Sequence, residues 1–554
     1  MSVFIGYPSF MAYQMMKGKK GINDGFPSIP GMIVRYSALG LTNEQMATNP
    51  VWVDKTGNGH DLQMKNFAWK GMSGVGGYEM SFNLWTNNVP SVPDISMSTT
   101  TTSVSVSVGN STYNNNLIYI HINNWDINKN HWLKVTSTYE DGDLAFVFYN
   151  NSNTKKIGLP ANGYVNILAY PEFKGSYMYI STTSNKQGSF TIEQLPLYPG
   201  ALVFDGVDDR GTCDNFPVLT KEKGYTVVAL RQWDQDFLNT TLTGGLLSTR
   251  NYSTGEGVAF EKIESSNKGY WNLGAGGIID FAKSPFTWQT SKQYNNVGIL
   301  KGDKNHGKPL CVGCGLSGGQ QCGRFAIWEL VFLDHDATEE ELTKIKDYFV
   351  KTYPWLFPDQ AWTVVGKTNE DEDRATIANI TGNGNDLVCL NLGFIEGSGY
   401  NEEGEYAGYL VTDGVDDKIV SSVFGMGKDF TIVGDWKLIN TGKNDNAGIV
   451  KFDSIVIYNY NPILINIKNG RNNLIPDQNT VNAICSDGRI YSKDWKESIY
   501  NEGTESTSKN LLTIGYSGNI YTKIAFKNLA IYPTVLSKED CIKAYNYLQT
   551  LKAK

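Results

Sequence analysis

A seven-residue phrase rich in Gly, Thr and Asn occurs twice in this chain. It reads TGNGHDL from Thr56 and TGNGNDL from Thr381. A phosphate-binding loop would need Gly-x4-Gly-Lys-Ser/Thr between a strand and a long helix, and neither copy has that pattern. The phrase therefore belongs either to an ion site or to a chain turn.

Calcium is the ion that the first copy could bind. Asp54, Asn58 and Asp61 would supply the hard oxygen ligands that calcium prefers. In the second copy Asn379 replaces Asp54, which removes a charge and limits any calcium prediction to the first copy. The alternative is a turn in which Gly and Asn adopt positive φ and the Asp accepts hydrogen bonds from backbone amides.

Paired acids occur in GVDD, at Gly206 to Asp209 and at Gly414 to Asp417. Glycoside hydrolysis needs two carboxyl groups about 5–9 Å apart that flank one bond. Adjacent residues of an extended segment point to opposite faces, so Asp208 and Asp209 do not meet that requirement. We expect tight turns here and a protein that is not an enzyme, with a glycoside hydrolase as the second alternative.

A group of soft ligands lies in HGKPLCVGCGLSGGQQC, where His306, Cys311, Cys314 and Cys322 could bind zinc. The alternative is that these cysteines are small buried residues of a strand. The second repeat has no cysteine at the matching positions. Seven cysteines, an odd number scattered over the chain, do not indicate a disulfide framework and fit synthesis in a reducing compartment.

Exposed aromatic rings could stack on sugars while neighbouring Asn and Asp side chains bind hydroxyl groups. The candidates by residue type are Trp125, Trp132, Trp233 and Tyr400. The competing interpretation for each of them is packing in a hydrophobic core.

The composition excludes some classes of protein. A net charge of −8 and the lack of a long Lys/Arg block make nucleic acid an improbable partner. No apolar run approaches the ~20 residues that span a bilayer, so membrane insertion is not expected. The apolar start MSVFIGYPSFMAYQMM predicts that residues 1–30 are an arm that docks on a partner, and no export leader is apparent in it.

The elements that must position these residues are repeated. GLTNE at Gly40 matches GKTNE at Gly366, and FDGVDDR at Phe204 matches TDGVDDK at Thr412. The stretch between the TGNG and GVDD landmarks is much longer in the first copy, which indicates an insertion. Because 554 residues exceed the roughly 250–300 of a single core, several domains are expected.

We therefore predict four segments. They are an arm at 1–30, a discontinuous sandwich at 31–89 and 200–357, an inserted β-sandwich at 90–199, and a second sandwich at 358–554. Short β-rich runs such as YTVVAL, DFTIVGDWKL and TSVSVSV, separated by Gly, Asn and Asp, favour antiparallel sandwiches. Thr338 with Glu341, and Ser537 with Asp540, predict a capped helix at the end of each repeat.

The ordered set TGNGHDL, FDGVDD, LTIGYSG and IAFKNLAIY followed by LSKEDCIKAYNYL resembles laminin-G-like, concanavalin A-like jelly-roll domains. The resemblance covers nearly all of both repeats and implies an all-β, lectin-like fold. The insert is similar to jelly rolls of carbohydrate-binding modules. The opening GKTNEDEDRATIANITGNGNDL resembles segments of proteins from gut Bacteroidota and their phages, including tailed-phage virion proteins.

This resemblance implies a non-enzymatic phage virion structural protein, a fibre or a head or tail decoration, that is made in the host cytoplasm and released by lysis. Its partners would be other virion proteins, reached through the N-terminal arm, and host surface glycans, and it would be an oligomer or part of a larger assembly. The alternative is a surface or secreted carbohydrate-binding protein of a gut bacterium. No cofactor is expected apart from the calcium candidate.

Overall fold

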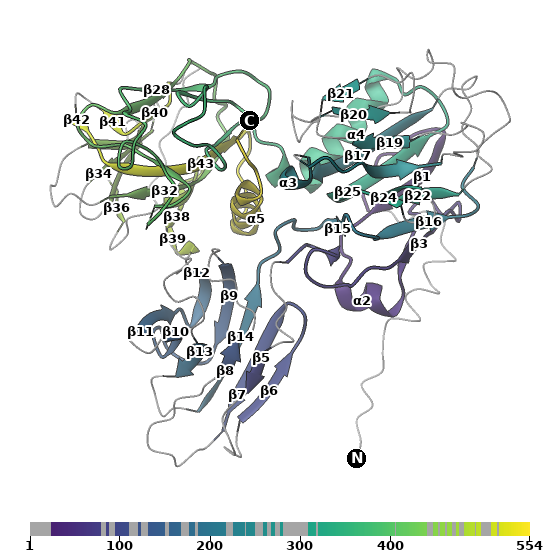
Figure 1. The fold of residues 1–554 in the computed structure, drawn as a ribbon, viewed down its shortest axis with the longest axis horizontal. Helices are drawn as coiled ribbons and strands as arrows, with labels where there is room; N and C mark the ends of the chain where they lie inside the picture. The colour runs from purple at the N-terminus through teal and green to yellow at the C-terminus, as the bar shows by residue number, and fades with distance from the viewer. Residues whose placement is uncertain are drawn as a thin grey trace. The chain divides into compact units, whose positions relative to one another are not determined.

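The computed structural model is an all-β protein with few helices, so the predicted fold class is confirmed (Figure 1). The described residues are 24–78, 85–87, 95–109, 120–122, 131–149, 154–167, 177–182, 187–217, 225–238, 240–249, 259–262, 268–271, 278–280, 309–316, 320–404, 406–439, 447–451, 455–459, 463–467, 473–475, 481–492, 495–499, 511–517 and 520–553. They fall into two compact units, one of residues 1–77 and 198–357 and one of residues 78–197 and 358–554. Among the described residues, no helix has the length and apolar character needed to cross a membrane.

The first sandwich has two sheets, antiparallel except for the pairing of β18 (Gly244–Ser248) with β24 (Gln320–Cys322), around one core. Its first sheet contains β1 (Met32–Ser37), β25 (Arg324–Leu333), β15 (Leu202–Asp205), β4 (Gly74–Val75) and β17 (Thr226–Trp233). Its second sheet contains β2 (Val51–Trp52), β3 (Leu62–Lys65), β16 (Arg210–Cys213), β22 (Leu310–Val312), β18 (Gly244–Ser248), β19 (Ala259–Lys262), β20 (Lys268–Trp271), β21 (Ile278–Asp280), β23 (Cys314–Leu316) and β24 (Gln320–Cys322). Its helices are α2 (Asn43–Thr48), α3 (Gln235–Leu238), α4 (Glu339–Thr352) and the 3-10 turn η5 (Pro354–Leu356).

The second sandwich repeats this arrangement. One sheet contains β29 (Gly399–Asn401), β30 (Tyr409–Val411), β43 (Ile524–Tyr532), β32 (Thr431–Leu438), β37 (Val481–Cys485), β38 (Arg489–Ser492), β39 (Glu497–Ile499) and β26 (Gln360–Thr363). The other contains β27 (Thr376–Ile377), β28 (Leu387–Leu390), β31 (Lys418–Ser421), β40 (Thr513–Ile514), β33 (Ala447–Lys451), β34 (Ile455–Asn459), β35 (Ile463–Ile467) and β36 (Asn473–Ile475). A two-stranded ribbon, β41 (Tyr516–Ser517) with β42 (Ile520–Tyr521), and helix α5 (Lys538–Gln549) complete it.

Strand pairing around the long central strand is the same in the two repeats. The long strand β25 pairs with β1, β15 and β17, and β43 pairs with their counterparts β26, β30 and β32. The register shifts at the same place in both, between Leu230 and Arg231 and between Asp435 and Trp436. A shared bulge at matched positions indicates one backbone design used twice.

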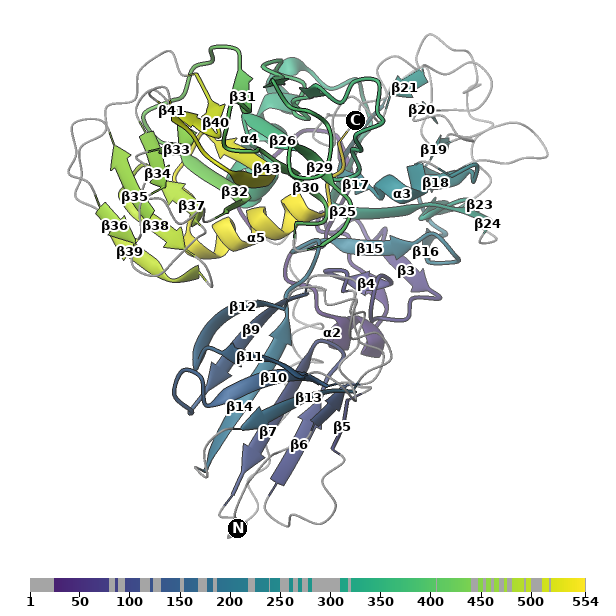
Figure 2. The ribbon, with the colours of Figure 1, turned by 60° about the vertical axis from the view of Figure 1, so that its left-hand side comes forward.

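Helices α4 and α5 begin where the sequence predicts. Thr338 accepts a hydrogen bond from the Glu341 amide, and the Glu341 carboxylate accepts one from the Thr338 amide, which completes a capping box. Ser537 caps α5 by accepting from the Asp540 amide. Helix α5 packs against β32 and β43 on the outer face of its sheet (Figure 2).

The residues between the two parts of the first sandwich form two five-stranded sheets of their own (Figure 2). One contains β11 (Thr154–Leu159), β10 (Leu144–Tyr149), β13 (Tyr177–Thr182), β8 (Ile120–Ile122) and β5 (Trp85–Asn87). The other contains β12 (Asn162–Ile167), β9 (His131–Ser137), β14 (Gly188–Gln194), β7 (Ser103–Val108) and β6 (Ile95–Thr99). Because β5 pairs with β8, β5 belongs to this pair of sheets, which is here called the insert.

The core of the insert follows from the alternation of its strands. In β7 the valines Val104, Val106 and Val108 are buried, and they pack with Phe146, Phe190 and other apolar residues in a separate hydrophobic cluster. The serines between them face outward, as the period of two requires.

Candidate functional site

The first TGNG phrase is a tightly bonded turn. The Asp54 carboxylate accepts hydrogen bonds from the Arg35 amide at 3.3 Å and the Thr56 amide at 2.9 Å. The Asp61 carboxylate accepts one from the Asp54 amide at 2.9 Å, and Asn58 Nδ2 donates to a backbone carbonyl at 2.7 Å. All three predicted calcium ligands therefore already hold protein partners.

The second phrase makes the same bonds without the extra charge. Asn379 Oδ1 accepts from the amides of Ala361 at 3.2 Å and Thr381 at 3.1 Å. Asp386 accepts from the Asn379 amide at 2.8 Å, and Asn383 Nδ2 donates to a backbone carbonyl at 2.8 Å. The side-chain amide of Asn379 thus accepts the same backbone hydrogen bonds as the Asp54 carboxylate. This turn geometry therefore does not require a cation.

The glycines of both phrases adopt the left-handed conformation that side chains disfavour. Their φ angles are 79° and 83° at Gly57 and Gly59, and 80° and 74° at Gly382 and Gly384. These values match the turn interpretation, in which glycine supplies positive φ at no steric cost. Calcium at the first copy stays a prediction.

The GVDD acids also stabilise turns. Asp209 is fully buried, and its carboxylate accepts from the Asp205 amide at 3.0 Å and from the Ser73 hydroxyl at 2.9 Å. Burial, together with the neighbouring carboxylates of Asp205 and Asp208, raises the pKa of Asp209 to about 7. These three acids each offer a carboxylate oxygen within 4.8 Å of the others.

The second copy repeats this arrangement. Asp417 is fully buried, and its carboxylate accepts from the Asp413 amide at 2.8 Å and the Ser398 hydroxyl at 2.7 Å. Burial raises its pKa as well. A buried carboxyl group that bridges two loops cannot reach a glycosidic bond, so the turn interpretation describes both copies.

The cysteine group is not a zinc site in this structure. Cys314 and Cys322 lie opposite each other on β23 and β24 and form a disulfide. Both sulfurs are thereby removed as zinc ligands, and the expectation of a reducing compartment did not foresee this bond. Cys311 is buried, and burial raises the pKa of its thiol to about 11. His306 lies outside the described residues.

Two of the four aromatic candidates are core residues. Trp233 is 3 % exposed and stacks with Phe237 at a centroid distance of 6.0 Å. Tyr400 is also 3 % exposed, stacks with Phe394, and its hydroxyl donates to the Arg374 carbonyl at 2.7 Å. Neither ring has a face open to a sugar, because the core packing covers both.

The other two candidates lie in the insert. Trp132, on β9, is half-buried and contacts two aromatic rings of the second sandwich. Trp125 lies outside the described residues.

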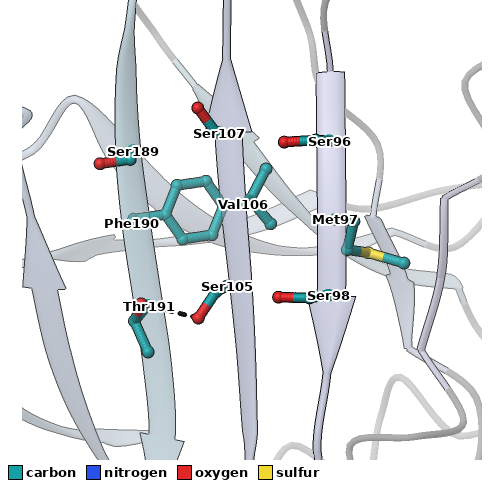
Figure 3. Close-up of a pocket in the computed structure, with 9 residues that line it drawn as sticks. All are labelled: Ser96, Met97, Ser98, Ser105, Val106, Ser107, Ser189, Phe190 and Thr191. Atoms are coloured by element: carbon teal, nitrogen blue, oxygen red, sulfur yellow. Dashed lines mark hydrogen bonds between the residues drawn. The ribbon is translucent and has the colours of Figure 1, made fainter. Parts of the chain in front are cut away.

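A hollow on the insert is the polar site that sequence reasoning missed. It has a volume of about 250 Å³ and is lined by Ser96, Met97, Ser98, Ser105, Val106, Ser107, Ser189, Phe190 and Thr191 from β6, β7 and β14 (Figure 3). Six of these nine residues carry hydroxyl groups, and none carries a charge. The signal in the sequence was SVSVSV, in which every second residue is a serine.

Strand register places the hydroxyls in cross-strand pairs. Ser96 lies opposite Ser107, and Ser107 lies opposite Ser189. Ser105 lies opposite Thr191, and their hydroxyl oxygens are 2.9 Å apart (Figure 3). The hollow thus offers closely spaced groups that can each donate and accept hydrogen bonds.

Comparison with known proteins adds little. No protein-family model matches the chain, and no curated protein matches it. Similar solved structures include a Trypanosoma rangeli sialidase in complex with sialic acid, at 10 % identity over 88 % of this chain and 91 % of that one, with a TM-score of 0.25. Another is the binding domain of botulinum neurotoxin serotype D, at 9 % identity over 59 % and 87 %, with a TM-score of 0.24. Such TM-scores carry no argument about fold or function.

Proposed function

We propose that this chain is a non-enzymatic protein of β-sandwich modules that binds neutral glycans through the hollow of the insert. The observation that carries the proposal is the hydroxyl lining of that hollow, with no charged side chain among its residues. Sugars are recognised by groups that both donate and accept hydrogen bonds, and serine and threonine hydroxyls do both. A lining without cations favours neutral over acidic sugars.

The non-enzymatic part of the proposal is supported by the paired acids. Hydrolysis by the usual route needs one carboxyl group as acid and another as nucleophile or base at the scissile bond. Asp209 and Asp417 are buried and bonded within their turns, and the hollow has no acid in its lining.

The biological setting that we propose is a phage virion, where the chain would serve as a fibre or as a head or tail decoration that touches host glycans. The resemblance of its repeats to concanavalin A-like, laminin-G-type domains of phage virion proteins supports this setting. Residues 1–30 would dock on another virion protein, and the chain would belong to a larger assembly. A surface or secreted carbohydrate-binding protein of a gut bacterium is the alternative setting.

Arg35 contacts Asp24 and Phe26, near the C-terminal end of the proposed arm. Arg35 Nη1 donates to the Asp24 carboxylate at 2.8 and 2.9 Å, and the Arg35 guanidinium lies 4.0 Å from the centre of the Phe26 ring. Residues 24–26 are thus fixed to the first sandwich, so an arm before them would leave from a defined point.

Glycan binding is tested with the full chain on an array of neutral and sialylated oligosaccharides, followed by calorimetry. Replacing Ser105 with Ala and Thr191 with Val together removes two hydroxyls while nearly keeping the shape of both side chains. Each hydrogen bond contributes roughly 0.5–1.5 kcal/mol, so we expect affinity for the best neutral glycan to fall about tenfold or more. The matched control is Thr154→Val, an exposed threonine on β11 in the opposite sheet.

Binding of no neutral glycan, or binding that the double variant leaves unchanged, would contradict the site. The setting is tested separately by mass spectrometry of purified virions from a producing host. Absence of the chain from virions, together with its recovery from bacterial cell surfaces, would favour the alternative setting.

A further inference from the structure

The polar face of the insert continues beyond the hollow along β14, β9 and β12. Glu193 on β14 lies opposite Lys134 on β9, and Lys134 lies opposite Tyr164 on β12. Trp132 comes two residues before Lys134 on β9 and therefore faces the same side of the sheet. Beyond the hydroxyls of the hollow, this face of the sheet therefore carries the charged side chains of Glu193 and Lys134 and then the Trp132 ring.

The Trp132 ring contacts aromatic residues of the second sandwich. Its centroid lies 5.1 Å from that of Tyr545 on α5, edge to face at 72°, and 6.5 Å from that of Trp495. Trp495 and Tyr545 also contact each other at 5.7 Å and 89°. Edge-to-face pairs at these distances stabilise contacts beyond the area they bury.

Trp495 is held in an unusual backbone conformation at this place. Its φ is 59°, a left-handed value that is rare for a bulky side chain, and the residue is 1 % exposed. Such a conformation persists only where the surrounding packing holds it. The ring also contacts Tyr491 at 6.1 Å, so the second sandwich fixes Trp495 from its own side.

Charged residues lie beside the aromatic contact between the insert and the second sandwich. Lys538, at the start of α5, places its ammonium group 6.0 Å from the centre of the Tyr164 ring. Burial raises the pKa of the Tyr164 hydroxyl, and the carboxylates of Glu539 and Glu193 also raise it. An aromatic centre with a polar rim is the usual anatomy of a specific interface.

We infer that Trp132 clasps the insert to helix α5 of the second sandwich, although the chain splices the insert into the first. The Trp132 ring is then an internal interface residue and not a sugar platform. The clasp fixes the glycan-facing sheet relative to α5, so the two modules move as one body. This inference does not depend on glycan binding, and its test reads no glycan.

The test is hydrogen exchange measured by mass spectrometry on the full chain and on Trp132→Ala. Loss of two ring pairs should speed exchange of the amides in residues 538–549 by roughly threefold to tenfold or more. Trp132→Phe should restore part of the protection. The matched control is Tyr149→Ala on β10, a 42 % exposed aromatic in the opposite sheet, which should leave residues 538–549 unchanged.

Two further measurements distinguish loss of the Trp132 contact from unfolding of the insert. Exchange in β10 and β13 reports whether the insert stays folded in Trp132→Ala. If it does not, Trp495→Ala tests the contact from the other side and should speed exchange in β9. Unchanged exchange of 538–549 in a folded Trp132→Ala chain, or of β9 in Trp495→Ala, would overturn the clasp.

Discussion

At the residue scale, the first sandwich contains a buried ion pair between Arg35 and Glu329. Glu329 is fully buried and accepts from Arg35 Nε at 3.0 Å and from the Tyr353 hydroxyl at 2.7 Å. In the second sandwich the matched positions hold Ala361 and Asn528, so the fold itself does not require this ion pair. The pair is a property of the first copy, next to the root of the N-terminal segment.

Replacing Arg35 alone should lower the stability of the first unit. We expect Arg35→Met to lower the free energy of unfolding of the first unit by about 3–5 kcal/mol, because Glu329 is left buried without its partner. Urea denaturation measures the change. The double variant Arg35→Met with Glu329→Leu should recover most of the loss, and a double variant as unstable as the single one would contradict this explanation.

The raised pKa of Asp209 predicts a pH dependence with a definite sign. Its pKa rises from 3.8 when unfolded to about 7 in the folded chain, so the folded state binds the proton more tightly. Between these values the folded state holds more protons than the unfolded state, and stability therefore falls as pH rises from about 4 to about 7. Melting temperatures of Asp209→Asn across that range should show a flatter profile than the native chain, and an equally steep profile would count against the assignment.

At the element scale, helices α4 and α5 show how a capping side chain fixes the residue at which a helix begins. The caps at Thr338 and Ser537 predicted both helices, and α4 buries Ile345, Tyr348 and Phe349. The short helices α2 and α3 were not predicted, because so few residues leave almost no periodic pattern. Thr42 does cap α2 by accepting a hydrogen bond from the Gln45 amide, a local signal like those of Thr338 and Ser537.

The capping box of α4 gives a prediction at this scale. Thr338→Ala leaves the Glu341 amide without its acceptor, so we expect the first unit to lose about 0.5–2 kcal/mol of unfolding free energy. Thr343→Ala, in the exposed middle of the same helix, is the control and should change stability much less. Chemical denaturation of both variants measures the difference, and equal losses would show that the cap is not responsible.

At the scale of the whole molecule, the insert enters and leaves the first sandwich at one place. The Gly76 amide donates to the Ala201 carbonyl and the Tyr198 amide donates to the Gly76 carbonyl, both at 2.8 Å. Neighbouring ends are the condition under which a domain can be spliced into a host without disturbing it. The insert also has its own hydrophobic cluster.

A chain that lacks residues 78–197, with Gly77 joined to Tyr198, should therefore keep the first sandwich folded. We expect its cooperative thermal transition to stay within a few degrees of the parent, because the host core contains no residue of the insert. Calorimetry and circular dichroism check this expectation. Loss of the transition of the first sandwich would show that the insert is required for its folding.

The sequence by itself determined what depends on neighbours along the chain. Turn glycines, helix caps and alternating strands are local, so the TGNG and GVDD turns, the closing helices and the all-β class could be predicted from residue types. The order of landmarks also revealed the two repeats, whose strands pair alike in the structure. The domain boundaries, the arm and the virion setting remain predictions.

Only the tertiary structure decided which residues meet across strands. Alternation assigns SVSVSV to two faces, but the pairing of β7 with β6 and β14 is what gathers six hydroxyls into one hollow. Long-range pairing likewise brings Cys314 opposite Cys322, buries Trp233 and Tyr400, and sets Trp132 against α5. The physical reason is that burial and contact depend on strand register and packing, which no short stretch of sequence specifies.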